Sequence, residues 1–121
     1  MSAGNFFETK RRATDLRTVT LTNASTYTVR TGGTTYNFIE DAVINVITTA
    51  SGNDLTITVP DGTYPGQRLI VNIVTEGDDE VTTITTTTGD DNTLDTEGDY
   101  AVYEWTNTTS GWQKVHGEVA S

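Results

Sequence analysis

The chain has 121 residues, no cysteine and a formal net charge of −10 at pH 7, and this length fits one domain with at most a short extension. The lack of cysteine excludes disulfides and thiolate metal sites, and no stretch approaches the roughly 18 apolar residues of a membrane-spanning helix. Leu, Ile, Val and Phe together supply only 26 residues, so we expect the chain to complete its core against copies of itself or a partner.

The charge is divided unevenly along the chain. Residues 1–30 carry five basic side chains against two acidic ones, a net +3, whereas residues 31–121 carry two against fifteen, a net −13. We therefore divide the chain into a basic N-terminal arm, residues 1–16, and an acidic body, residues 17–121. A protein that binds nucleic acid presents a broad basic face, so the acidic body argues against a nucleic-acid partner. The first residues lack the apolar core of a secretory signal.

The arm combines two neighbouring phenylalanines with a basic cluster. An apolar anchor beside arginines suits an acidic groove on a partner, because the rings bury apolar surface and the guanidinium groups pair with carboxylates. The alternative is a disordered tail, but two exposed neighbouring phenylalanines would be unfavourable. The only candidate helix is a short turn over residues 8–16. The predicted partner-binding residues are Phe6, Phe7, Lys10, Arg11, Arg12 and Arg17.

The body is rich in threonine, a β-branched residue that favours strands and weakens helices. The predicted strands span residues 17–22, 27–30, 36–39, 43–48, 55–59, 68–74, 81–88, 100–106 and 112–119. Short strands that recur every 8–12 residues between turn signals are typical of a sandwich or barrel. We therefore predict an all-β fold, a small antiparallel β-sandwich or barrel with an extended N-terminal arm. In the threonine-rich strand at residues 81–88, the pattern does not show which face is buried.

Acidic residues gather in two segments, 76–80 and 89–99, which we interpret as solvated turns that keep the protein soluble. The second segment, GDDNTLDTEGD, has enough carboxylates for a calcium loop, but their spacing does not match an EF-hand. We predict no metal and no cofactor. The single histidine, His116, and the absence of a GxSxG motif give no support to nucleophilic catalysis, so we predict that the chain is not an enzyme.

Three aromatic residues fall on the last two predicted strands: Tyr103, Trp105 and Trp112. If exposed, such rings would form a platform on which sugars stack, as in carbohydrate-binding modules. The alternative is that they close the core or line an interface between subunits. We prefer this alternative, and the sequence leaves both readings open.

Two long segments of the body resemble a β-module of virion proteins from tailed bacteriophages. The family pattern is a strand, a DG…GQ turn, a central apolar strand and a closing GDY…EW…GW hairpin. It covers residues 55–75, which include LTITVPDGTYPGQRLIVNIV, and residues 98–119, GDYAVYEWTNTTSGWQKVHGEV. The matching positions are Asp61-Gly62, Gly66-Gln67, Leu69–Val74, Gly98-Asp99-Tyr100, Glu104-Trp105 and Gly111-Trp112.

The resemblance implies a role in the virion, because such modules occur in head decoration proteins, head fibres and tail-fibre segments, commonly as trimers. The small size favours a capsid decoration (cement) protein, which binds the outer surface of the phage head and stabilises it. We expect the major capsid protein and further copies of this chain, as a homotrimer, to be its partners, with no nucleic acid and no membrane. Synthesis would occur in the host cytoplasm. The alternatives are a head- or tail-fibre adaptor and a carbohydrate-binding β-sandwich module.

Overall fold

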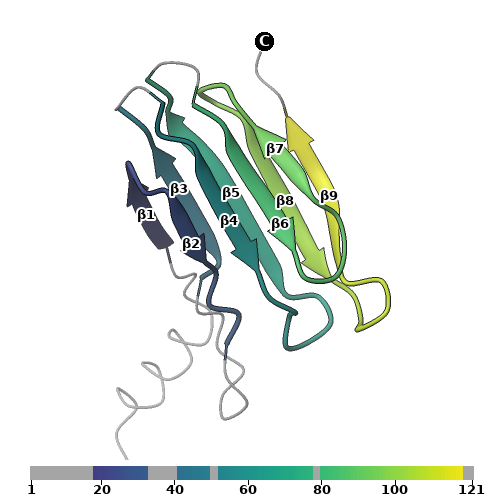
Figure 1. Ribbon diagram of the computed structural model, residues 1–121. Helices are drawn as coiled ribbons and strands as arrows, with labels where there is room; N and C mark the ends of the chain where they lie inside the picture. Colours follow the sequence, from purple (N-terminus) through teal and green to yellow (C-terminus); the bar gives the residue numbers. More distant parts are fainter. Residues whose placement is uncertain (1–17, 33–40, 50–51, 78–79, 119–121) are drawn as a thin grey trace, which may run out of the picture.

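A computed structural model describes residues 18–32, 41–49, 52–77 and 80–118, with the backbone alone for residues 116–118 (Figure 1). Across these residues the fold is all-β. The strands are β1 (Thr18–Thr22), β2 (Thr26–Thr28), β3 (Val43–Ile47), β4 (Leu55–Val59), β5 (Arg68–Thr75), β6 (Thr82–Thr86), β7 (Asn92–Leu94), β8 (Tyr100–Trp105) and β9 (Trp112–Glu118). The described part of the chain contains no helix of the length and apolarity needed to cross a membrane.

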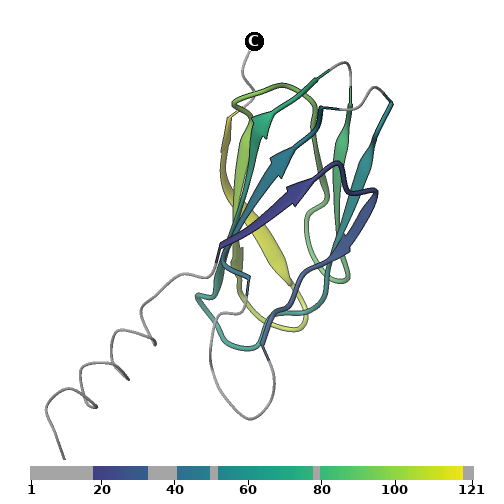
Figure 2. The same cartoon turned by 90° about the vertical axis from the view of Figure 1, so that its left-hand side faces the viewer.

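The strands form two sheets that stack face to face as a β-sandwich, which the edge-on view of Figure 2 separates into two layers. Sheet A has five strands in the order β1-β3-β5-β8-β9, and sheet B has four in the order β2-β4-β6-β7. Both sheets are open, so the predicted sandwich is confirmed and the barrel alternative is not. The predicted strands over residues 36–39 and the helical turn over residues 8–16 lie outside the described residues.

The expectation of purely antiparallel sheets is wrong, because both sheets are mixed. From β1 to β6 the chain alternates between sheet A and sheet B, and each crossing reverses its direction. Strands that neighbour each other in a sheet therefore run the same way, so β1, β3 and β5 are parallel, as are β2, β4 and β6. Only β7, β8 and β9 add antiparallel pairs, through β6–β7, β5–β8 and β8–β9.

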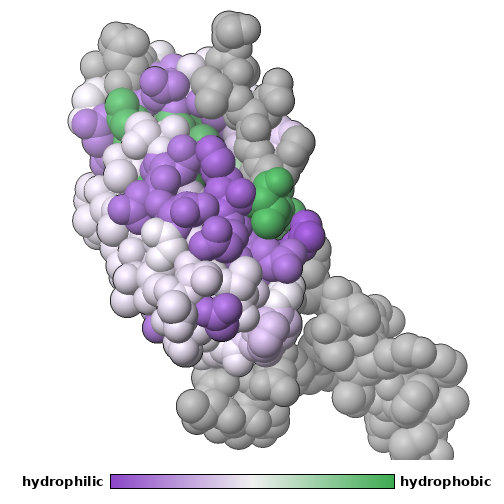
Figure 3. All heavy atoms as spheres, turned by 90° about the vertical axis from the view of Figure 1, so that its right-hand side faces the viewer, coloured by the Kyte–Doolittle hydropathy of each residue, from purple (hydrophilic) through white to green (hydrophobic). Residues whose placement is uncertain are grey.

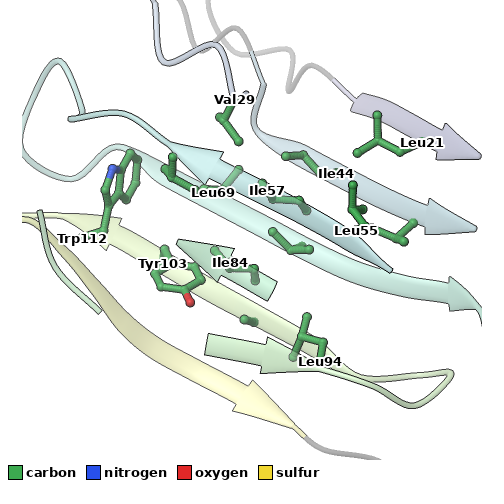
Figure 4. Packing of buried hydrophobic residues seen from close by; sticks show 14 of the residues in the cluster. Leu21, Val29, Ile44, Leu55, Ile57, Leu69, Ile84, Leu94, Tyr103 and Trp112 are labelled. Carbon is green, nitrogen blue, oxygen red and sulfur yellow. The ribbon is translucent and has the colours of Figure 1, made fainter. Parts of the chain in front are cut away.

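The core lies between the two sheets and follows the alternation of side chains along each strand. In β4, Leu55, Ile57 and Val59 are buried, and the threonines between them are exposed. Figure 4 shows the side chains of Leu55 and Ile57 beside those of Ile44 and Leu69 of sheet A. The structure also shows which face of the threonine-rich strand β6 is buried, because Thr82, Ile84 and Thr86 face inward.

One strand was missed in the sequence. β7 lies inside the segment 89–99, which the acidic composition predicts to be a solvated turn, and Leu94 is its buried residue. Its three residues hold a single apolar side chain, too few to show a period of two. Pairing with β6 supplies the hydrogen bonds that make this segment a strand, so only tertiary structure defines it.

Candidate binding surfaces

The topology gives the sandwich two chemically different ends (Figure 1). At one end, called here the arm end, β1 begins at Thr18, so residues 1–17 join the body there. The opposite end, called the acidic end, carries the turns after β1, β3, β5 and β7. The acidic side chains of its described residues are Asp54, Glu76, Glu80, Asp95, Glu97 and Asp99, and these turns contain no described basic residue.

The basic side chains of the described body are Arg30, Arg68 and Lys114, and all lie toward the arm end. Arg30 follows β2, Arg68 begins β5, and Lys114 lies in the first half of β9. Acids occur at this end too, namely Asp41, Asp61, Asp90, Asp91 and Glu104. Two of them pair with cations: Arg30 Nη2 lies 3.1 Å from Asp41, and Arg68 Nη2 lies 2.9 Å from Glu104. The excess negative charge of the described body therefore gathers away from the point where the arm joins it.

Several acidic side chains of segments 76–80 and 89–99 form hydrogen bonds within the turns. The interpretation of these segments as solvated turns is therefore wrong for those side chains. Asp99 is buried, and its Oδ2 accepts hydrogen bonds from the amides of Asp95 and Thr96 at 3.1 and 3.0 Å. Glu80 is also buried and accepts from the amides of Gly52 and Gly77. Carboxylates that accept from backbone N–H groups satisfy donors that would otherwise be unpaired, so these acids stabilise the loops.

The candidate calcium segment does not form one loop. Strand β7 divides it, leaving Asp90 and Asp91 at the arm end and the remaining three acids at the acidic end. Asp91 accepts from the amide and hydroxyl of Thr86, and Asp90 accepts from the amide of Lys114. Within the described residues no three His, Cys, Asp or Glu side chains converge in a metal-binding group.

A buried carboxylate that sequence reasoning did not single out closes the arm end. Asp41 Oδ2 accepts from the Tyr27 hydroxyl at 2.6 Å and from the Arg30 amide at 2.7 Å, and the Arg30 guanidinium covers Asp41 from the solvent side. Burial and the neighbouring Asp41 carboxylate raise the pKa of Tyr27, and the hydrogen bond to Asp41 raises the pKa of Arg30. This cluster joins the end of β2 to the start of β3.

Some of the residues that carry the phage-module resemblance meet in space at the arm end, whereas Gly98-Asp99-Tyr100 lies at the acidic end. The Gly66 amide donates to the Trp105 carbonyl at 2.9 Å, and the Trp105 amide donates to the Gln67 carbonyl at 2.8 Å. Gln67 is buried and holds the turn through a 2.7 Å bond from the Thr63 amide. Gly62 packs against the Trp105 ring so closely that a Cβ atom would lie 2.6 Å from Cδ2. These motif residues build a turn that fastens two strands of sheet A.

The three aromatic residues proposed as a possible sugar platform are buried, so that reading is wrong. Tyr103 and Trp105 face inward from β8, and Trp112 begins β9 with its Nε1 donating to the Pro60 carbonyl at 2.8 Å. Figure 4 shows Tyr103 and Trp112 among the buried hydrophobic residues. The two indole rings meet edge to face with centroids 5.6 Å apart. Stacking on a sugar requires an exposed ring face, whereas these rings fill the end of the core.

The outer faces of the two sheets differ in chemistry. The strand register aligns Thr26, Thr56, Thr83 and Thr93 across sheet B, with Thr28, Thr58 and Thr85 in the next row. On sheet A, the register instead aligns Val43, Ile70 and Val102 across three central strands, each half-buried. The two faces therefore present threonine on one side of the molecule and aliphatic side chains on the other.

The predicted arm residues, from Phe6 to Arg17, lie outside the described residues. Tyr103, Trp105 and Trp112 all lie within them. His116 falls in β9, where its side chain is not described. No protein-family model matches the chain, and no curated protein matches it.

Proposed function

We propose that this chain is a structural protein of a phage virion, a capsid decoration protein that binds the outer surface of the head as a homotrimer and stabilises the shell. The observation that carries this proposal is the separation of charge: the basic arm joins the body at one end, and six described acidic side chains occupy the turns of the other. Such a molecule docks with its arm end on an acidic surface and presents its acidic end to solvent, where like charge repels other particles.

The proposed mechanism is mass action. A protein that binds the assembled shell more tightly than its dissociated subunits shifts the equilibrium toward the assembled shell. The arm supplies the contacts: Phe6 and Phe7 bury apolar surface, and the arginines pair with carboxylates of the major capsid protein. Because the ion pairs lie at a solvated interface, added salt screens them and weakens binding.

The phage-module motifs support the proposal in a second way. In the structure several of these motif residues secure the turn between β4 and β5 and the β8–β9 hairpin. A body that carries its binding segment at one end is the arrangement expected of a protein that reinforces a lattice.

The test is co-sedimentation with shells assembled from the major capsid protein encoded in the same genome. We expect the full chain to sediment with the shells and to be released as salt rises. A variant with Lys10, Arg11, Arg12 and Arg17 all replaced by Ser is expected to stay in the supernatant. The control is Arg68→Ser, which removes a cation from the sheet face at the same end of the body. Full occupancy by the arm variant would overturn the proposal.

A further inference from the structure

We propose that Asp61, in the turn between β4 and β5, isomerises to isoaspartate in the folded protein, and that the turn cannot accommodate the product without loss of stability. In this modification the backbone amide nitrogen of the next residue attacks the aspartate side chain. It therefore depends on the identity of that residue and on whether the carboxylate is held elsewhere. Such chemistry is independent of capsid binding and goes beyond the proposed function.

Asp61 is the only aspartate or asparagine in the chain that is followed by a glycine. Any other residue at the next position carries a Cβ atom, which hinders the approach of the carboxyl carbon to the amide nitrogen. Glycine has no Cβ and the widest range of backbone conformations, so an Asp-Gly pair reaches the geometry for attack most readily. The sequence therefore distinguishes residue 61 from all other aspartates and asparagines of the chain.

The structure shows why glycine occupies position 62. A Cβ atom there would lie 2.6 Å from Trp105 Cδ2 and 2.7 Å from Trp105 Cβ, and the φ of Gly62 lies outside the left-handed region. The glycine is therefore required for space and not for its backbone conformation. Trp105 is buried and meets the Trp112 ring edge to face, so the packing of the core fixes the residue that makes Asp61 labile.

The Asp61 carboxylate is also free to react. Asp61 is exposed, and within residues 18–32, 41–49, 52–77 and 80–118 its carboxylate accepts no hydrogen bond and the Gly62 amide donates none. Every other aspartate in these ranges has a carboxylate that accepts at least one hydrogen bond: Asp41, Asp54, Asp90, Asp91, Asp95 and Asp99. Those bonds hold the carboxylates in place, whereas the Asp61 side chain can turn toward its own main chain.

Exposure alone does not leave a carboxylate free. Figure 3 shows the β7–β9 side of the molecule, where hydrophilic side chains cover much of the surface. Asp90 and Asp91 precede β7 and are exposed. Even so, Asp90 Oδ2 accepts from the Lys114 amide at 2.9 Å, and Asp91 Oδ1 accepts from the Thr86 amide at 2.8 Å. Asp61 thus differs from these exposed aspartates both in its hydrogen bonding and in the residue that follows it.

The reaction needs no reagent other than water. The Gly62 amide nitrogen bonds to Asp61 Cγ, and the amide proton leaves with the hydroxyl of the protonated carboxyl group as water. Water then cleaves one of the two carbon–nitrogen bonds of the cyclic imide. Cleavage at Cγ restores aspartate, whereas cleavage at the Asp61 main-chain carbonyl carbon leaves Gly62 attached through Cγ. The second product is isoaspartate, which has the same mass and carries a free α-carboxylate.

The turn holds its main chain too tightly for this product. Isoaspartate places Asp61 Cβ in the main chain and lengthens it by about 1.5 Å. On one side the Pro60 carbonyl accepts from Trp112 Nε1 at 2.8 Å, and on the other the Thr63 amide donates to Gln67 Oε1 at 2.7 Å. The longer segment must therefore displace Gly62 from the Trp105 ring or break one of these hydrogen bonds, and we expect the modified chain to unfold at a lower temperature.

The test incubates the full chain for several weeks at mildly acidic pH, below its melting temperature, and then digests it with trypsin. Trypsin cuts after Arg30 and Arg68, so Asp61 falls in the peptide of residues 31–68. We expect this peptide to separate into two species of equal mass, and electron-transfer fragmentation to place isoaspartate at residue 61. Asp41 and Asp54 lie in the same peptide and should remain aspartate.

Two variants keep the charge of the chain and separate residue 61 from other exposed aspartates. Asp61→Glu would have to form a larger cyclic imide, which is far slower, so we expect its peptide to remain a single species. The matched control is Asp95→Glu, which changes an exposed aspartate elsewhere and should isomerise at residue 61 as the wild type does. A single species from the wild type, or equal amounts of isoaspartate at Asp54 and Asp61, would overturn the proposal.

The same incubation in urea measures what the fold contributes. We expect isoaspartate at residue 61 in both conditions, because the folded turn leaves the Asp61 carboxylate and the Gly62 amide without hydrogen bonds. Isoaspartate in urea but not in native buffer would overturn the proposal, since the fold would then protect the site.

Thermal unfolding of the incubated protein, followed by circular dichroism, tests the loss of stability. We expect the incubated wild type to show a second transition at lower temperature, and the incubated Asp61→Glu variant to show none. Treatment with an isoaspartyl methyltransferase, which returns isoaspartate to aspartate, should remove the second transition. One unchanged transition in a sample that contains isoaspartate at residue 61 would overturn the second part of the proposal, that the turn cannot accommodate the longer chain.

Discussion

At the scale of single residues, the fold depends on positions whose role is invisible in composition. Gly62 is required because the Trp105 ring occupies the space of a side chain, and Gly66, four residues later, is required because its φ is 89°. One glycine provides room and the other provides backbone freedom. Both lie in the DG…GQ turn, which the sequence identifies only as a turn between two strands.

This difference predicts the effects of two substitutions. Gly62→Ala should lower the free energy of unfolding by about 3 kcal/mol, because the added methyl group collides with a ring held by the core. Gly66→Ala meets no atom within 4 Å and should cost only about 1 kcal/mol, the strain of a positive φ. Urea unfolding of both variants checks this, and equal losses would show that the ring moves aside.

At the scale of elements, the acidic turns act as structural connections. Asp99 joins the turn before β8 through two amide hydrogen bonds, while its own carbonyl accepts from the Ile73 amide of β5. A cluster of acidic residues in a sequence indicates solvated surface. The sequence pattern does not show which carboxylate accepts hydrogen bonds from backbone N–H groups. Burial of Asp99 and Glu80 is decided by how the turns pack against one another.

We therefore expect Asp99→Ala and Asp95→Ala to differ although both remove one negative charge. Asp99→Ala leaves two amides without their acceptor in a buried turn and should cost about 2 kcal/mol of stability. Asp95 is exposed, and its replacement should change stability by less than about 0.5 kcal/mol. Thermal unfolding followed by circular dichroism measures both, and similar melting temperatures would contradict a structural role for Asp99.

At the scale of the whole molecule, buried tyrosine links stability to alkaline pH. Burial, together with the charges of Asp90 and Asp91, raises the pKa of Tyr103, and burial also raises the pKa of Tyr27 and Tyr64. The unfolded chain releases these protons near pH 10, whereas the folded chain keeps them to higher pH. Stability is therefore complete below about pH 10 and falls as the pH rises above it.

Replacing Tyr103 by Phe measures how much of this loss of stability at alkaline pH comes from Tyr103. Its hydroxyl is buried and finds no hydrogen-bond partner in the described structure, so Tyr103→Phe should unfold no more easily than the wild type at pH 7. Above about pH 10 the variant should lose stability less steeply, by up to about 1.4 kcal/mol per pH unit. Urea midpoints between pH 7 and pH 11 measure this, and parallel curves for the two proteins would contradict it.

The sequence by itself determined the class of fold and most of the strands. Threonine and branched aliphatic residues at a period of two define strands such as Leu55–Val59, because burial on one face and hydration on the other is a local pattern. The unequal charge of arm and body was likewise a property of composition, and the glycine and proline turn signals located most strand ends.

Only the tertiary structure decided how these strands are joined and what their faces meet. The alternation of β1 to β6 between sheets makes their pairings parallel, and β7 exists only beside β6. The burial of Tyr103, Trp105 and Trp112, and the alignment of Val43, Ile70 and Val102 into one row, depend on register between strands distant in the chain. Periodicity reports which residues share a face, but pairing and layer order arise from long-range contacts that no local pattern encodes.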